Sequence, residues 1–283
     1  MRRLSSGVAM LAAVGLLAFG TSGCTTEQRV KTETSLAKAL ISDEQSEAIG
    51  KQVHQELEKE NVRFVDDSVV ESYVEEVSGR IFKYAKQDRP DVDYHVHVID
   101  DPKTVNAFAT PGGHLYVYTG LLLTADNEAE LAGVMAHEAG HVAGRHIERQ
   151  MVNTYGLQTV TALALGNDPA MIKQLAATVA GTGLLRAHSR SEETEADEYG
   201  ARYTAKAGYD PQALITFFEK LQKQEGSTPR VMAWLQTHPT SEQRIAHLEK
   251  YIDEHNLEGA NRPTDRLQQV QQRLRRDGGR TTG

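Results

Sequence analysis

The pentapeptide His137-Glu138-Ala139-Gly140-His141 places two histidines four residues apart, with a glutamate next to the first. On an α-helix, residues four apart lie one turn above each other on the same face. Two imidazoles arranged in this way can hold one Zn²⁺, and the glutamate can act as base on a water that the metal activates. The pattern therefore indicates hydrolytic metal chemistry, provided that the chain supplies further ligands.

The third ligand is not fixed by the pentapeptide. A catalytic zinc normally takes three protein ligands and leaves one position for water. The longer pattern H-E-x-x-H-x-x-G-x-x-H is excluded, because it requires histidine where this chain has Ile147, although Gly144 fits. The chain offers several other candidates, which are His95, His97, His146, His188, Glu192, Glu193, Glu195 and His238.

One pair of acidic residues in a later segment has a spacing that suits a metal site. Glu193 and Asp197 lie four residues apart in a segment that we expect to be helical, so they share one helical face. The glutamate can then ligate a metal while the aspartate orients a ligating histidine by hydrogen bonding. Glu192 and Glu195 point to other sides of the same helix, and we expect them to be solvated.

The elements that must position these residues are mostly helical. Helices are expected over 42–59, from 68, over 127–149, as a pair within 156–185, over 191–207, from 210, and from 240 to 255. Between the second and third of these, residues 94–99 alternate with a period of two, which predicts a strand with His95 and His97 on its polar outer face. Residues 106–113 and 114–119 indicate an irregular strand, a Pro-Gly-Gly turn and a returning strand. The fold class is therefore α+β, mainly helical, with a small antiparallel sheet of about three strands.

The start of the chain has the features of an export signal. A positive start, an apolar run from Val8 to about Gly20 and small residues after it are typical of a secretory signal peptide, here over 1–23. The only cysteine, Cys24, follows two small residues in an arrangement that resembles a bacterial lipobox. That resemblance implies cleavage before Cys24 and lipid attachment to it, while a plain signal peptide with an incidental cysteine stays open. Thr25 then favours sorting to the outer membrane.

The composition limits the remaining possibilities. The formal net charge of −8 argues against nucleic acid as a partner. No segment after the signal is apolar over the eighteen or so residues that a membrane-spanning helix needs. We expect 24–40 to be a polar lipid-anchored tether and 259–283 to be a polar tail that is partly disordered.

Four motifs follow one another along the chain. They are Asn106-Ala107-Phe108-Ala109, the H-E-x-x-H pentapeptide, Glu193-x-x-x-Asp197, and His238-Pro-x-x-x-x-Arg244-Ile. Together they resemble the M48 metallopeptidases, over about Ser42 to Ile252. Within that family the chain looks most like the soluble periplasmic lipoproteins. The resemblance implies a zincin-like peptidase domain, which we place at 41–258.

The resemblance also implies a role for each matching residue. His137, His141 and Glu193 would bind one Zn²⁺ per chain, and Glu138 would be the general base. Asp197 would support a ligating histidine.

Three further roles follow from the same resemblance. Arg244 would belong to the wall of the site. His238 would either stabilise the oxyanion or take the fourth metal position in a closed, latent form. The strand at 106–109 would be a sheet edge on which an extended substrate pairs. By spacing alone, His146 is expected to be structural or to support the site, and the helices within 156–185 to act as a lid.

The function expected from these observations is zinc-dependent endopeptidase activity in the bacterial cell envelope. The substrates would be misfolded or unfolded envelope proteins, and the enzyme would lie in the periplasm, lipid-anchored at Cys24 to the outer membrane. A second hypothesis is a chaperone-like assembly factor for outer-membrane proteins that uses the peptidase fold mainly for binding. The physiological substrate and the oligomeric state are not indicated by the sequence.

Overall fold

The computed structural model describes residues 34–35, 37–39, 41–60, 62–164, 168–182, 188–224, 229–261 and 265–278. The expected signal peptide, Cys24 and most of the expected tether lie outside these residues. Among the residues described, no helix combines the length and the apolar character that crossing a membrane requires.

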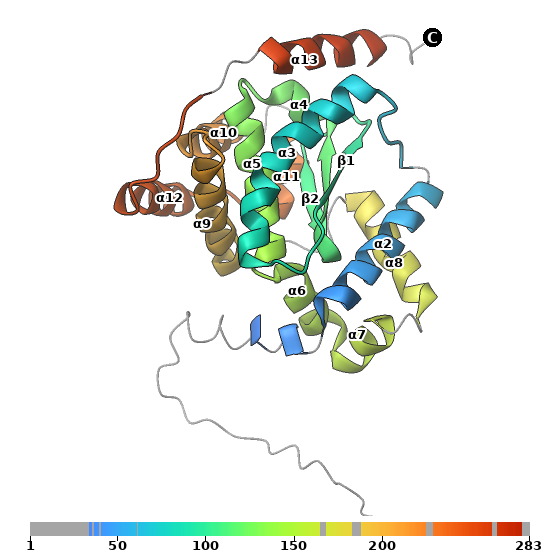
Figure 1. Cartoon of the computed structure of the whole chain (residues 1–283). Coiled ribbons are helices and arrows are strands. Elements are labelled where there is room, and N and C mark those ends of the chain that lie inside the picture. The colour runs from blue at the N-terminus through green and yellow to red at the C-terminus, as the bar shows by residue number, and fades with distance from the viewer. Residues whose placement is uncertain are drawn as a thin grey trace, which may run out of the picture.

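Helices account for most of the described chain, and the mainly helical α+β class is confirmed (Figure 1). Local capping explains where several begin: Ser42 and Gln45 form a capping box, Asp67 caps the helix that begins at Ser68, and Ser241 caps the helix that begins at Glu242. The helices are α2 (Asp43–Lys59), α3 (Ser68–Asp88), α4 (Thr119–Thr124), α5 (Glu128–Ala143), α6 (His146–Tyr155), α7 (Leu157–Ala164), α8 (Pro169–Thr182), α9 (Arg190–Lys206), α10 (Gln212–Gln224), α11 (Pro229–Thr237), α12 (Glu242–Glu254) and α13 (Asp265–Gly278).

The sheet has the expected three strands, but it is mixed rather than wholly antiparallel. Its order is β1 (His95–Ile99), β3 (His114–Tyr118), β2 (Ala107–Thr110). β2 and β3 pair antiparallel across the short helix η1 (Pro111–Gly113), as expected from the Pro-Gly-Gly turn. β1 and β3 are parallel. After β1 the chain crosses to form β2 one strand position away, and β3 then returns between β1 and β2. β2 is therefore an edge strand.

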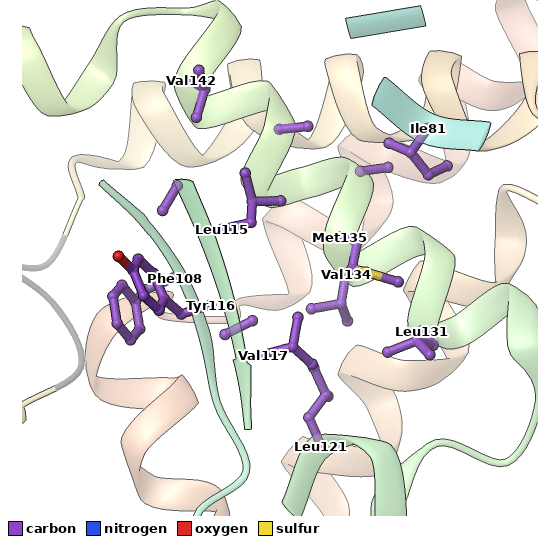
Figure 2. Packing of buried hydrophobic residues seen from close by; sticks show 14 of the residues in the cluster. Ile81, Phe108, Leu115, Tyr116, Val117, Leu121, Leu131, Val134, Met135 and Val142 are labelled. Carbon is purple, nitrogen blue, oxygen red and sulfur yellow. The ribbon is translucent and has the colours of Figure 1, made fainter. Parts of the chain in front are cut away.

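The helix that carries the pentapeptide, α5, lies at the centre of the molecule (Figure 1). Figure 2 shows Leu115 and Val117 of β3 directed toward α5, where Val134 and Met135 meet them. Side chains of a strand alternate between its two faces, so the neighbouring Tyr116 points away from α5. The opposite side of α5 packs against α9. The catalytic motifs of the sequence thus lie on two helices buried side by side.

Two glycines allow these helices to approach closely. A Cβ atom added to Gly140, inside the pentapeptide, would lie 2.8 Å from the carbonyl oxygen of Ala196 on α9. A Cβ added to Gly200 of α9 would lie 3.2 Å from the Cα of His137. Both separations are shorter than ordinary van der Waals contact, so larger residues here would push α5 and α9 apart.

The helix expected over 127–149 is interrupted, which corrects the sequence analysis. α5 ends before Gly144, and Arg145 adopts a left-handed conformation with φ 56° before α6 begins. Buried Arg89 donates to the carbonyl of Val142 at 2.6 Å and to Glu148 at 2.6 Å, so the break is held by a buried ion pair. The reversal of the chain brings His146 back toward the end of α5.

The expected polar tail at 259–283 contains a well-packed helix, α13, which lies against α3 and α4 (Figure 1). Leu267 and Val270 are buried on its inner face. The side-chain amide of Gln271 donates to the carbonyls of Leu122 and Ala125 at 2.9 and 2.8 Å, at the C-terminal end of α4. The many charges of this segment conceal an apolar stripe at helical spacing, which is why it was interpreted as a tail.

Candidate metal centre

Four side chains from three parts of the chain converge on one buried point. They are His137 and His141 of α5, Glu193 of α9 and His238, and one ligand atom from each lies within 4.8 Å of the others. All four residues are buried. α5 presents its two histidines one turn apart, α9 brings the glutamate alongside, and His238 follows α11.

The separations between these atoms suit a single small ion. The Nε2 atoms of His137 and His141 are 3.0 Å apart, and they lie 3.6 and 3.5 Å from the two carboxylate oxygens of Glu193. Tetrahedral zinc with ligand bonds of 2.0–2.1 Å requires ligand atoms about 3.3 Å apart. The observed separations bracket that value.

The charge of Asp197 determines which nitrogen of His137 is free to ligate. Its Oδ1 lies 2.9 Å from Nδ1 of His137, which favours a proton on Nδ1 and leaves the lone pair of Nε2 directed at the centre. Arg244 holds Asp197 through two contacts, of 2.5 and 2.8 Å. Asp197 therefore has the position expected of a residue that orients a ligand.

His141 is oriented by a different route, through His146, which the sequence predicts to be structural or to support the site. Its Nδ1 lies 2.8 Å from Nδ1 of His146, whose Nε2 lies 3.1 Å from Oε2 of Glu195. A carboxylate accepts only, so His146 donates to Glu195 and in turn accepts the Nδ1 proton of His141. The lone pair of Nε2 of His141 is then also directed at the centre.

Glu195 and Glu192 were expected to be solvated, and this was wrong. Glu195 accepts from His146 and lies 3.4 Å from Arg149, while Glu192 closes a capping box with Ser189 at the start of α9. The missed signal is the break after α5, because only a chain that reverses at 144–145 brings His146 within reach of both His141 and α9.

The electrostatics of the centre favour a bound cation. Two imidazole lone pairs and a carboxylate face one another across a buried space, an arrangement that is costly unless a positive charge lies between them. Burial lowers the pKa of His137, but its hydrogen bonds with Asp197 and Glu193 outweigh burial and raise that pKa to about 9 in the metal-free protein. Burial and the neighbouring His188 hold the pKa of His141 well below its usual value. A metal that binds here competes with the proton of His137.

Arg244 supplies the counter-charge on the other side of Glu193. Its Nη1 lies 2.5 Å from Oε2 of Glu193, and its guanidinium packs over the ring of Phe218. Burial would raise the pKa of Glu193, but the charges of Arg244 and His238 outweigh it and hold the pKa well below its usual value. The carboxylate is thus kept ionised, as a metal ligand must be.

Glu138 lies next to the ligands but contributes no ligand atom. It is buried, and among the described residues neither of its carboxylate oxygens has a hydrogen-bond partner. Burial raises its pKa. A buried carboxylate without partners and with a raised pKa is suited to accept a proton.

The two ring nitrogens of His238 face different groups of the site. Its Nδ1 lies 3.0 Å from Oε1 of Glu193 and 3.3 Å from Nε2 of His137, inside the ligand set, and its Nε2 lies 3.3 Å from Glu138. The ring stacks on buried Trp234 of α11, with centroids 4.3 Å apart. Trp234 was not among the expected site residues, although it lies one helical turn before His238.

The expected substrate strand lies at the edge of the sheet, but its side chains are covered. Residues Asn106 to Ala109 are all buried, and within the described chain the side-chain amide of Asn106 has no hydrogen-bond partner. The expected lid corresponds to α7 and α8, which pack on α2. Gly183, in the same expected lid, lies outside the described residues.

The chain is similar to a family of known proteins. The model of peptidase family M48 matches residues 68–252. The chain is 36% identical to the mitochondrial metalloendopeptidase OMA1 of Schizosaccharomyces pombe over 182 residues, which are 64% of this chain and 53% of that protein. It is 33% identical to the beta-barrel assembly-enhancing protease of Escherichia coli over 192 residues, which are 64% of this chain and 39% of that protein. The match therefore spans about half of the first relative and less of the second.

Proposed function

The chain belongs to peptidase family M48, and on this premise we propose that it is a zinc-dependent endopeptidase of the bacterial cell envelope. Its substrates would be misfolded or unfolded envelope proteins. The observation that carries the proposal is the buried set of His137, His141 and Glu193 with the unpartnered carboxylate of Glu138 beside it.

The donor set fits zinc better than a hard cation. Two imidazole nitrogens and one carboxylate are ligands that zinc takes in hydrolytic sites, whereas magnesium and calcium take oxygen ligands almost entirely. When bound, zinc supplies Lewis acidity, which polarises a carbonyl and lowers the pKa of water to about 7.

Individual residues of the chain then have separate roles in hydrolysis. Glu138 takes the proton of the attacking water and passes it to the amine that leaves. Asp197 and His146 keep the two ligating imidazoles in the required tautomers. Arg244 keeps Asp197 and Glu193 ionised.

His238 has to move or share its position when substrate binds. Its Nδ1 lies among the ligand atoms, and we infer from this that the arrangement is a closed form of the site. We propose that the displaced imidazole donates to the oxyanion of the tetrahedral intermediate.

An extended substrate would pair with β2, an edge strand of the sheet. Main-chain pairing gives affinity with little sequence preference, which suits unfolded proteins. Because the residues of β2 are buried, the residues that cover them must move before a substrate strand can pair. Proline replacements at 107–109 should abolish cleavage of an unfolded substrate, and unchanged cleavage would rule this route out.

Placement in the envelope rests on the expected signal and on a similarity. The chain resembles the beta-barrel assembly-enhancing protease, whose name refers to β-barrel assembly. We propose a lipid anchor at Cys24 and attachment to the outer membrane. Membrane fractionation of the wild type and of a Cys24→Ser variant tests this, since the variant should leave the membrane fraction.

Catalysis is tested by comparing the wild type with Glu138→Gln. The variant should keep the metal, since Glu138 is not a ligand, and should not cleave casein, whereas the wild type should cleave it until a chelator is added. Casein cleavage by Glu138→Gln, or cleavage by the wild type that a chelator leaves unchanged, would contradict the proposal.

A further inference from the structure

A second group of histidines lies on the opposite face of the sheet. The parallel register pairs His95 of β1 with His114 of β3 and His97 with Tyr116, so all four side chains share the face directed away from α5. Figure 2 shows Tyr116 on that side of the strands. α2 brings His54 onto the same face, where its ring stacks on His97 with centroids 4.0 Å apart.

Two of these imidazoles have nitrogen atoms at a separation that two ligands of one ion can adopt. Nε2 of His97 lies 3.0 Å from Nδ1 of His114, and the two rings are nearly parallel, with an interplanar angle of 11°. This separation equals that between the Nε2 atoms of His137 and His141 at the metal centre. It also suits two ligands on one ion, for which tetrahedral coordination requires about 3.3 Å.

His95 is the imidazole best able to complete the set. It is exposed, its ring lies 4.9 Å from that of His114, and none of the described residues forms a hydrogen bond with it. His54, by comparison, is held by the hydroxyl of Tyr116 at 3.1 Å from its Nδ1. Rotation of the exposed side chain of His95 therefore brings a third nitrogen to the pair without disturbing the core, and it also leaves a path by which an ion can enter.

We propose that His97, His114 and His95 bind a second divalent transition-metal ion, apart from the catalytic centre. Sites made of imidazole nitrogens prefer zinc, copper or nickel to magnesium or calcium. The ion would join β1 to β3 on the face of the sheet opposite to α5. The proposal does not depend on peptidase activity, because none of the three residues touches the catalytic ligands.

Counting bound zinc tests the proposal directly. The full chain without an affinity tag is dialysed against buffered Zn²⁺ alone, and metal per chain is measured by mass spectrometry. We expect two zinc ions per wild-type chain and one per chain of His97→Asn and of His95→Asn. His141→Ala, which damages the catalytic site, should also hold one, and it should lose that one when His95→Asn is added.

Exposed His247 of α12 provides the matched control. Its side chain is paired with Glu198 and lies on a different element, so His247→Asn should keep two zinc ions. One zinc ion per wild-type chain would overturn the proposal, as would two in His95→Asn, and His97 and His114 would then share only a hydrogen bond. If His97→Asn fails to fold, as judged by circular dichroism, the exposed His95→Asn variant decides the outcome alone.

Discussion

Replacing His146 with phenylalanine should weaken metal binding although His146 is not a ligand. The imidazole is buried and accepts the Nδ1 proton of His141 at 2.8 Å, which fixes the tautomer that directs Nε2 at the centre. Phenylalanine keeps an aromatic ring in this buried place while the acceptor is lost. Glu195 keeps Arg149 as a partner at 3.4 Å, so the substitution leaves no isolated charge.

The magnitude follows from what is removed. A buried N–H of His141 loses its acceptor, and removing such a partner of a metal-ligating histidine typically costs 10–100-fold in metal affinity, or about 1.4–2.8 kcal/mol. Competition with a fluorescent zinc chelator measures the affinity, and activity at saturating zinc shows whether the chemistry itself is affected. ¹⁵N spectra of the apo protein should report a mixture of His141 tautomers in the variant.

His188→Phe is the matched control. His188 stacks on His141 with centroids 3.8 Å apart, but the described structure has no hydrogen bond between them. Phenylalanine retains the stacking, so affinity should change by no more than about threefold. Equal losses in both variants, or unchanged affinity in His146→Phe, would refute the idea that tautomer control passes through His146.

Three other expectations concern stability. Burial lowers the pKa of His97 to about 3 and that of His114 to about 4, so above pH 6.5 neither the folded nor the unfolded form is protonated there. As pH falls from 6.5 toward 4, only the unfolded form binds the protons, and the free energy of unfolding of metal-free protein should fall by about 1.4 kcal/mol per pH unit for each group. His97→Phe should remove one of these contributions in urea unfolding, and an unchanged slope would contradict it. Gly140→Ala should push α5 away from α9 and thereby lower the free energy of unfolding by about 1–3 kcal/mol. It should also lower the affinity for zinc. Wild-type values of both quantities would show that the two helices can accommodate the extra methyl group. Leu267→Ala should cost about 2–5 kcal/mol in urea unfolding, because Leu267 is buried on the inner face of α13, and no loss would mean that this helix does not dock.

The parts of the fold that the sequence predicts are those encoded locally. Capping residues and a period of 3.6 locate most helices, and alternation locates the strands, so the α+β class follows from patterns within short windows. The parallel pairing of β1 with β3 does not, because it depends on which side of β3 the chain crosses after β1. The docking of α13 was missed for a related reason, since Leu267 and Val270 are few among many charges and reveal their role only against α4.

The same difference between local and long-range signals applies to the metal centre. The pentapeptide and the Glu193–Asp197 spacing are helical periodicities, so the sequence is enough to place each pair on one face of its own helix. His146 and Glu195 act through a chain reversal at Arg145, whose left-handed conformation has no signal in the residue pattern. The histidines of β1 were interpreted as a polar strand face, because their pairing with His114 depends on the register of a distant strand.

Anomalous diffraction at the zinc absorption edge, from crystals of the wild-type protein, locates the bound metal. We expect a peak at bonding distance, about 2.0–2.2 Å, from Nε2 of His137, Nε2 of His141 and a carboxylate oxygen of Glu193. Zinc-supplemented crystals with no peak among these three residues would contradict it.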